Sequence, residues 1–535
     1  MRRAAPAAYM FALGTAVFLA WMHATVLWPG NIGWLLVGDD RGQSALGLFA
    51  WMRAGSGLHQ PLLGSPEGTA LLFTDSIPLL AVLLTPIAQW LPAGIQLIGP
   101  WYLACLLLQA AFAWALIRRW TKEPIAAAAG TALLTAFPVL LNRYAHASLC
   151  AQWLLLWALW IYMEPRRADR PWAWMAVLGV TALVHSYLLL MVAAFWGSAV
   201  LERMIRAPGR GRVIAGASLV IAPVLAILVL DGVFAGPFAS TGTYGRFPAA
   251  LDAWWNPANP DYAALAWSSP AGPAGQGFEG FNYLGAGLIA LVLLAVAQVV
   301  TGRLDAERRA LLRRLAWLLP AFAVLAIVAI GPAPQWRGQA LFAVPIPRAL
   351  VDTLDPVRAA GRLLWPLTYT LAFVAIACAG AWRRATVMLV VALAVQVIDL
   401  TPMLAAVRPA SAIADDPRLY HRTIDPRWDQ FVAEASAVQF EPALAYRDLR
   451  LMEELGWRAV TACRPLRYFY SSRLSAATRR RLADDSRAVA AGRIDPTRLY
   501  ILVEGKLPAP VLAKARRLDG ALIIAPSRPA PPRTC

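Results

Sequence analysis

Charge-free apolar runs of membrane-spanning length recur along this chain of 535 residues, and they constrain its fold more than any other feature. Residues 4–38, 77–117 and 171–201 contain no Asp, Glu, Lys or Arg. About 20 apolar residues suffice for a helix that crosses the core of a bilayer, so each run can hold at least one crossing. With 59% hydrophobic and 15% charged residues, the chain is predicted to be an all-α polytopic membrane protein.

Short arginine clusters between the apolar runs indicate which ends of the spans face the cytoplasm. Arg2 and Arg3 precede the first run, and further clusters lie at 118–122, 166–170, 203–212, 303–314 and 383–384. Positive residues favour the cytoplasmic side, so we expect the N-terminus there, in a bacterial inner (plasma) membrane. The net charge of +18 is interpreted as a topology signal, and no nucleic-acid partner is expected.

Alternation between these clusters predicts eleven crossings. The run 171–201 is flanked by arginines at both ends, so it must cross twice, with a turn near His185. Residues 76–90 are predicted to form a re-entrant or juxtamembrane helix. The expected spans are one within 4–38, then 96–117, 124–142, 145–163, two within 171–201, 213–230, 281–301, 315–330, 363–382 and 385–403. An odd number of crossings places the C-terminus outside.

The chain is expected to divide into a membrane domain, residues 1–405, and an extracytoplasmic soluble tail, residues 406–535. Outer loops are expected at 29–76, 231–280 and 331–360. In the tail, helical patterns at 446–455 and 476–485 and β-prone runs at 460–463, 499–503 and 521–524 predict a small α/β domain. The Pro-rich residues 526–535 are interpreted as a frayed end. Cys463 and Cys535 would share an oxidising compartment, and whether they pair is left open.

Two adjacent carboxylates, Asp39 and Asp40, follow the first apolar run and are the leading candidates for chemistry. One interpretation is a catalytic base, because partial burial between helices can raise a carboxyl pKa toward the working range. The other is a pair of carboxylates that end a helix in water. Both interpretations are open at this point.

Arg358 and Arg362 lie at the outer boundary of a predicted span with i, i+4 spacing. On a helix, this spacing places both guanidinium groups on one face, where they could clamp a phosphate. The alternative is that they extend to the membrane interface without a ligand.

Four further residues are weaker candidates. Asp75 precedes Ile77 and Pro78, a context that also fits the N-cap of a helix. Glu279 lies among glycines at the rim of a span, and His185 could equally be a packing residue. Gln43 follows Asp40 by three positions. The five cysteines show no CxxC or Cys/His ligand spacing, so no metal-binding residue is assigned.

Several motifs carry a resemblance to known membrane proteins. Gly38-Asp39-Asp40 with Gln43, the stretch Phe73 to Leu80, the stretch Gln276 to Gly285, and Arg358 with Gly361-Arg362 resemble an uncharacterised bacterial family of membrane proteins. That family lies near the GT-C superfamily of polyprenyl-phosphate-sugar-dependent glycosyltransferases. The wider arrangement, with an acidic residue after the first span, a long first loop, many spans and a soluble C-terminal domain, is similar to GT-C proteins.

The resemblance implies a cell-envelope glycosyltransferase that moves a sugar from a polyprenyl-phosphate donor to an extracytoplasmic glycan or lipid acceptor. It implies that Asp40, with Asp39 next, serves the acceptor. Arg358 and Arg362 would hold the donor phosphate. Further substrate-binding candidates are Gln43, Asp75, His185 and Glu279. Some GT-C members use a divalent cation, but no ligand set is readable here. The alternatives are a transporter or flippase of lipid-linked sugars, and a non-catalytic envelope assembly factor.

Overall fold

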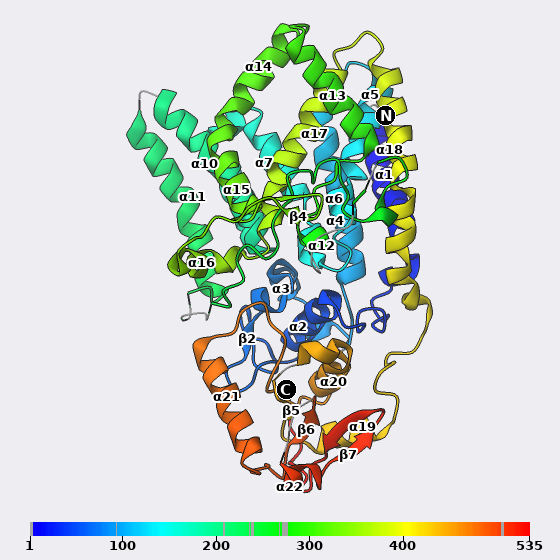
Figure 1. Cartoon of the computed structure of the whole chain (residues 1–535), viewed down its shortest axis with the longest axis vertical. Coiled ribbons are helices and arrows are strands. Elements are labelled where there is room, and N and C mark those ends of the chain that lie inside the picture. Colours follow the sequence, from blue (N-terminus) through cyan, green and yellow to red (C-terminus); the bar gives the residue numbers. More distant parts are fainter. Residues whose placement is uncertain are drawn as a thin grey trace.

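A bundle of long helices occupies one end of the molecule and the tail occupies the other (Figure 1). This computed structural model describes residues 4–92, 94–206, 209–234, 236, 240–266, 268–269, 276–443, 445–503 and 508–535. Part of the predicted outer loop 231–280, namely residues 235, 237–239, 267 and 270–275, lies outside the described residues. The N-terminal helix and helix α14 (Ala306–Leu315) reach the end of the bundle that is farthest from the tail (Figure 1).

Within the described residues, seven helical segments are long and apolar enough to cross a membrane. They are Ile98–Ile117, Pro124–Leu141, Ser186–Arg206, Arg210–Leu230, Ala306–Ile330, Ala360–Ala379 and Ala385–Asp415. Four shorter apolar helices accompany them, Ala5–Trp21, Ala147–Tyr162, Pro171–Ala182 and Ala286–Val300. The helical membrane architecture is therefore as expected, whereas the number of eleven crossings stays a prediction.

Some helices of the bundle, such as α11 and α18, expose large apolar side chains, whereas others, such as α17, are mostly buried. Their bounds are α1 Ala4–Trp21, α4 Ile98–Ile117, α5 Pro124–Thr135, α6 Pro138–Leu141, α7 Trp153–Tyr162, α8 Pro165–Ala168, α9 Pro171–Ala182, α10 Ser186–Arg206, α11 Arg210–Leu230, α13 Ala286–Val300, α15 Leu319–Ile330, α17 Trp365–Ala379 and α18 Ala385–Val407. Leu219 and Val229 on α11, and Val391 and Ile398 on α18, are more than half exposed. Contiguous exposed apolar faces of this kind fit contact with lipid.

The predicted turn within 171–201 is confirmed. Helix α9 ends at Ala182 and α10 begins at Ser186, with Leu183, Val184 and His185 between them. The first apolar run behaves differently from the expectation, because α1 ends at Trp21. Residues 22–38 instead form turns and the short 3-10 helix η1 (Ala24–Leu27), and within them residues 32–36 are buried. Pro29, Gly30 and Asn31, which favour turns, follow η1.

The first loop, residues 29–76, carries its own secondary structure. Asp40 begins helix α2 (Asp40–Ala54), which is followed by the hairpin β1 (His59–Gln60) and β2 (Thr69–Ala70) and the 3-10 helix η2 (Leu71–Thr74). The segment predicted as a juxtamembrane helix holds α3 (Pro78–Leu84) and η3 (Ala88–Trp90). Leu83 and Trp90 are largely exposed there.

The two later loops, which are predicted to be outer, hold short elements. These are η5 (Pro260–Tyr262), α12 (Gln276–Glu279), the hairpin β3 (Gln335–Trp336) and β4 (Gln339–Ala340), α16 (Arg348–Leu354), η7 (Asp355–Val357) and η8 (Ala360–Leu364). They lie between the bundle and the tail, or beside the bundle (Figure 1).

The tail is a four-stranded sheet with helices, as the α/β prediction implies. The sheet order is β5 (Val438–Glu441), β6 (Leu499–Leu502), β8 (Ala521–Ile524), β7 (Arg516–Leu518), with β5 and β6 parallel and the other pairs antiparallel. Its helices are α19 (Arg427–Glu434), α20 (Leu449–Thr461), α21 (Ala476–Ala490) and α22 (Ala509–Leu512). The strands expected at 499–503 and 521–524 are confirmed.

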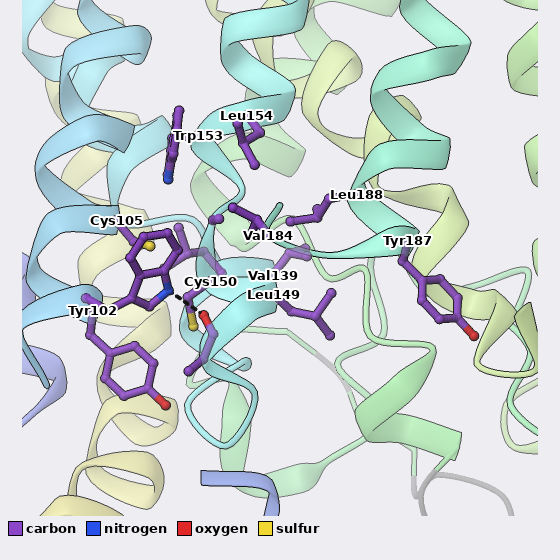
Figure 2. Close-up of a cluster of buried hydrophobic side chains, with 14 of the residues drawn as sticks. Tyr102, Cys105, Val139, Leu149, Cys150, Trp153, Leu154, Val184, Tyr187 and Leu188 are labelled. Atoms are coloured by element: carbon purple, nitrogen blue, oxygen red, sulfur yellow. Dashed lines mark hydrogen bonds between the residues drawn. The ribbon is translucent and has the colours of Figure 1, made fainter. Parts of the chain in front are cut away.

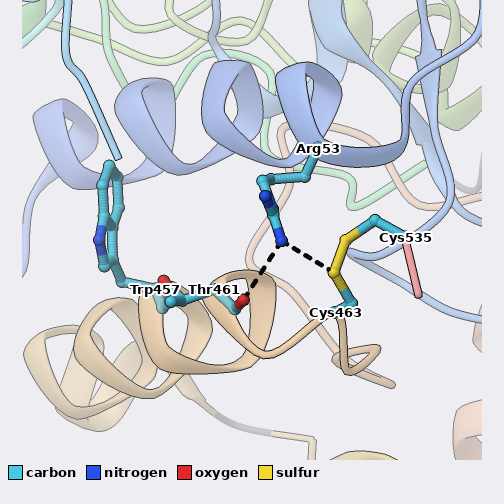
Figure 3. The surroundings of a disulfide bond; sticks show 5 residues. All are labelled: Arg53, Trp457, Thr461, Cys463 and Cys535. Atoms are coloured by element: carbon cyan, nitrogen blue, oxygen red, sulfur yellow. Dashed lines mark hydrogen bonds between the residues drawn. A yellow bond between two sulfur atoms is a disulfide. The ribbon is translucent and has the colours of Figure 1, made fainter. Parts of the chain in front are cut away.

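One predicted strand and the predicted frayed end are wrong. Residues 460 and 461 complete α20, because Leu451, Leu455 and Ala459 recur with helical spacing and are buried on one face. The C-terminal residues are held in place. Cys535 forms a disulfide with Cys463 at the end of α20, beside Arg53 of the first loop (Figure 3).

The tail packs directly on the first loop. Phe49 of α2 stacks on Trp457 of α20, with ring centroids 4.1 Å apart. Arg481 of α21 forms an ion pair of 2.8 Å with Glu67, and Ser472 donates a backbone hydrogen bond to the carbonyl of Phe73. The loop after the first helix and the last domain of the chain thus form one layer below the bundle.

A cluster of buried, mostly large side chains lies among α4, α7 and α10. Tyr102 and Cys105 of α4 lie near Cys150 and Trp153, and Val184 and Leu188 close the cluster on the side of α10 (Figure 2). Trp101 donates its indole N–H to the carbonyl of Ala147 at 2.8 Å. These contacts fix the chain between α6 and α7, which carries Arg143 and His146.

Candidate functional site

The two adjacent carboxylates of the first loop have different environments. Asp39 is the N-cap of α2 and accepts the backbone N–H of Arg41 at 2.9 Å. Its carboxylate also pairs with the guanidinium of Arg41 at 2.7 Å. Asp40 instead approaches His146, with Oδ2 2.7 Å from Nε2. The two carboxylates therefore have different partners, Arg41 for Asp39 and His146 for Asp40.

Asp40 and His146 form a dyad with one free carboxylate oxygen. Nε2–H of His146 donates a hydrogen bond to Oδ2 of Asp40, while the other ring nitrogen, Nδ1, is buried and has no partner among the described residues. Oδ1 of Asp40 has no hydrogen-bond partner in the described part of the chain, and the Asp40 side chain is 27% exposed. The free oxygen can therefore accept a proton from a bound hydroxyl group.

Glu279 is held by two arginines from different segments, Arg143 in the turn after α6 and Arg362 in η8. It accepts hydrogen bonds from Nε of Arg362 at 2.6 Å and Nη2 at 2.5 Å, and from Nη1 of Arg143 at 3.0 Å. Arg143 is fully buried, and its guanidinium lies 4.1 Å from the ring centroid of Phe278. Two cations face one anion here, so this group carries a net positive charge.

The dyad and the Glu279 group are neighbours. Nη2 of Arg362 lies 3.4 Å from Nε2 of His146. Burial acts to raise the pKa of Glu279, but Arg362, His146 and Arg143 outweigh it and lower that pKa to about 2. Burial also acts to raise the pKa of Asp40, and His146 outweighs it, so the pKa of Asp40 is lowered. Both carboxylates are ionised at neutral pH.

Asp75 adds a carboxyl group that titrates near neutral pH. It follows η2 in the left-handed conformation, with φ of 53°, and the N-cap of α3 is Ile77. The interpretation of Asp75 as a helix N-cap is therefore wrong. Burial, and next the charge of Asp40, raise the pKa of Asp75 to about 6. Asp40 and Asp75 thus lie close enough to repel each other.

Gln43 and His185 lie near this cluster with different roles. Gln43 is one turn after Asp40 on α2, is buried, and neither atom of its amide has a partner among the described residues. His185 accepts the backbone N–H of Tyr187 through Nδ1 at 3.1 Å and so helps to begin α10. Its ring packs near the ring of Tyr187, over which Arg362 lies.

The expected clamp of Arg358 and Arg362 on one helix face is wrong. The two residues belong to separate 3-10 turns, η7 and η8, because Ala359 between them leaves the helical conformation. Arg362 is occupied by Glu279. The side chain of Arg358 forms no hydrogen bond or ion pair with any described residue, although its charge acts on Asp75.

Sequence reasoning missed Arg143 and His146. Arg143 is the one Asp, Glu, Lys or Arg residue within 124–163, and the predicted topology places it on the outer side, where the positive-inside rule disfavours arginine. An isolated arginine in this position could have been recognised from the sequence as a candidate site residue. Tyr470 and Arg473 of the tail also face the cluster, and nothing local in the sequence marks them.

Across the described ranges, no group of three or more His, Cys, Asp or Glu residues is arranged to hold a metal ion.

Two family models match the chain. The model of a domain of unknown function (DUF6311) matches residues 11–401, and the model of the DUF6311 C-terminal domain matches residues 427–526. A search of curated proteins finds no match. Because the two models cover most of the chain, it belongs to the DUF6311 family.

Proposed function

We propose that this DUF6311 protein is a membrane glycosyltransferase that moves a sugar from a polyprenyl-phosphate donor to an extracytoplasmic glycan or lipid acceptor. One observation carries the proposal. Asp40 keeps one carboxylate oxygen free while His146 holds the other at 2.7 Å, at the level where the first loop meets the bundle. A carboxylate oriented in this way can act as a general base toward an acceptor hydroxyl group.

In the proposed reaction, the acceptor hydroxyl group displaces the polyprenyl phosphate from the sugar. The acceptor oxygen forms a bond to the anomeric carbon of the donor sugar, and its proton moves to Oδ1 of Asp40. The bond between the anomeric carbon and the phosphate oxygen breaks, and its electron pair stays on the phosphate. His146 stabilises the Asp40 carboxylate and fixes its orientation, so that Oδ1 faces the acceptor.

The surrounding charges favour departure of an anionic phosphate. Arg143 and Arg362 share the single carboxylate of Glu279, so one positive charge remains in excess. Arg358 adds a cation that no described carboxylate neutralises. Cations placed where negative charge develops lower the barrier of such a transfer. Polyprenyl phosphate, as the leaving group, gains negative charge at this point.

The arrangement of the chain in space supports an extracytoplasmic site. The N-terminal helix and the arginine-rich α14 lie at the end of the bundle opposite to the tail (Figure 1). If those arginines face the cytoplasm, then the tail, the first loop and Asp40 lie outside. This orientation and the GT-C likeness are parts of the proposal.

Transfer by purified protein tests the proposal. Protein in lipid nanodiscs is incubated with polyprenyl-phosphate sugars carrying a radiolabel, and sugar transfer or release is measured. We expect activity that Asp40→Asn removes and that Asp39→Asn retains, which makes Asp39→Asn a matched control. Inactivity across donors, combined with movement of a fluorescent lipid-linked sugar across vesicle membranes, would overturn the transferase and favour a flippase.

A further inference from the structure

Arg473 of the tail lies against the chain segment that carries Arg358. Its Nη2 donates hydrogen bonds to the carbonyl of Asp355 at 3.3 Å and of Pro356 at 2.5 Å, just before Arg358. Its Nη1 donates to the carbonyl of Ser472 at 2.8 Å. All three acceptors are backbone carbonyls, so they orient the guanidinium without neutralising its charge.

The carboxylate nearest in sequence to Arg358 is already occupied. Asp355 accepts the backbone N–H of Thr241 at 2.8 Å and of Thr243 at 2.9 Å, together with both threonine hydroxyls. Neither Arg358 nor Arg473 forms an ion pair with a carboxylate among the described residues. Burial, and next the charge of Arg358, lower the pKa of Arg473. The positive charges of Arg358 and Arg473 repel each other, and an anion bound between the two guanidinium groups would offset this repulsion.

Arg473 also lines a cavity between the first loop and the tail. The cavity has a volume of about 290 Å³, and its wall includes the polar residues His59, Thr69, Ser471, Ser475 and Thr478. Arg467, a second arginine in the wall, is held by Asp485 at 2.8 Å. The wall therefore offers hydroxyl groups beside a guanidinium that keeps its charge available.

The same tail segment reaches the candidate site. Tyr470, three residues before Arg473, lies where the charges of Asp40, Arg358 and Asp75 act on its hydroxyl. Residues 470–473 therefore run from the cavity wall to the cluster around Asp40. A ligand held by Arg473 would lie near Asp75, whose charge acts on Arg473.

We propose that Arg473 of the tail and Arg358 of the membrane domain together bind the phosphate group of a phosphorylated lipid. The lipid class rests on the proposed function, whereas the binding itself requires no sugar transfer. The tail would then be a structural part of the substrate site, and Arg362, which Glu279 occupies, would act by positioning other groups.

Binding of polyprenyl phosphate without a sugar tests this inference. The full chain in nanodiscs is titrated with the lipid, and Arg473→Gln, Arg358→Gln, Arg473→Lys and the control Arg487→Gln are compared. Arg487 lies on exposed α21, where it pairs with Asp484. We expect each Gln variant to weaken binding by about 10-fold or more, the scale of a charge-assisted hydrogen bond. Arg473→Lys should recover part of the loss, and Arg487→Gln should bind normally.

Further measurements separate binding from structural damage and from the proposed reaction. Direct phosphate binding predicts a smaller salt dependence of affinity in Arg473→Gln and weaker competition by inorganic phosphate. Normal affinity and salt dependence in Arg473→Gln overturn the inference even when transfer is active. Equal competition by free phosphate at low concentration would show that the lipid chain adds nothing, and would overturn the lipid assignment. Arg473-dependent binding without any sugar transfer would sustain the inference and overturn the proposed function alone.

Discussion

Glu453, on α20 of the tail, accepts a hydrogen bond of 2.7 Å from the backbone N–H of Gly38, two residues before Asp40. Gly38 has φ of +88°, a conformation that favours glycine. The carboxyl group of Glu453 also lies over Gly42, where a side chain would overlap it. The last domain of the chain therefore sets the start of α2, and with it the direction of Asp40.

Replacement of Glu453 should separate its hydrogen bond from its charge. Burial raises the pKa of Glu453 well above its usual range, so the neutral Gln resembles the protonated acid. We expect Glu453→Gln to keep kcat within a few-fold. Glu453→Ala leaves the Gly38 N–H unpaired and should lower stability by about 1–3 kcal/mol as well as kcat. Thermal unfolding and transfer rates check this, with exposed Asp484→Ala as the control. Equal loss in both variants would contradict it.

The two neighbouring aspartates should differ strongly in their effect on transfer. Asp40→Asn should lower kcat by about 10²-fold or more with donor affinity retained, as expected for loss of a general base. Asp39→Asn should be mild, because Asn also caps helices well. Steady-state rates and donor binding of the purified variants check this. A larger loss in Asp39→Asn would place the base one residue earlier.

Glu279 and Arg362 should show strong coupling in stability. Glu279→Gln leaves Arg143 and Arg362 without their shared carboxylate and should destabilise the protein by about 3–5 kcal/mol. Glu279→Gln combined with Arg362→Gln should recover part of this loss, because one buried cation is removed as well. Denaturant unfolding of the four proteins gives the coupling energy. Additive effects would mean that the ion pair contributes little.

Asp75→Asn should stabilise the protein in a pH-dependent manner. The pKa of Asp75 is raised to about 6, so the folded state binds its proton more tightly than the unfolded chain, and stability is lost as pH rises toward 6. The variant should match the original protein near pH 4 and exceed it above pH 6 by about 1–3 kcal/mol. Asn also tolerates the left-handed backbone. Thermal midpoints at both pH values check this, and equal gains at both would contradict the titration.

The disulfide between Cys463 and Cys535 offers a test of both stability and orientation. If the tail lies in an oxidising compartment, a maleimide should label these thiols in intact cells only after reduction. Cys463→Ser should lower the stability of the tail by about 2–5 kcal/mol, since it releases the chain end that packs by α20 (Figure 3). Buried Cys378→Ser is a control outside the tail. Labelling without reduction would place the tail in a reducing compartment.

Local sequence patterns determined much of the membrane domain and several residues of the cluster. Charged side chains are unfavourable in a bilayer, so runs that lack them predict helices, and the residues that interrupt them become visible. Asp40, Asp75, Glu279, Arg358 and Arg362 were recognised in this way. The turn before α10 was predictable as well, because arginines at both ends of one run require an even number of crossings.

Only the tertiary structure decided how these residues are paired. Asp40 meets His146, Glu279 joins Arg143 to Arg362, and Glu453 reaches Gly38 across most of the chain. The resemblance ranked Asp40 before Asp39, but the different environments of the two side chains depend on where α2 begins against the tail. The sequence could not place Arg473 beside Arg358. Contacts between residues far apart in sequence depend on the packing of whole elements, which no local spacing of residue types records.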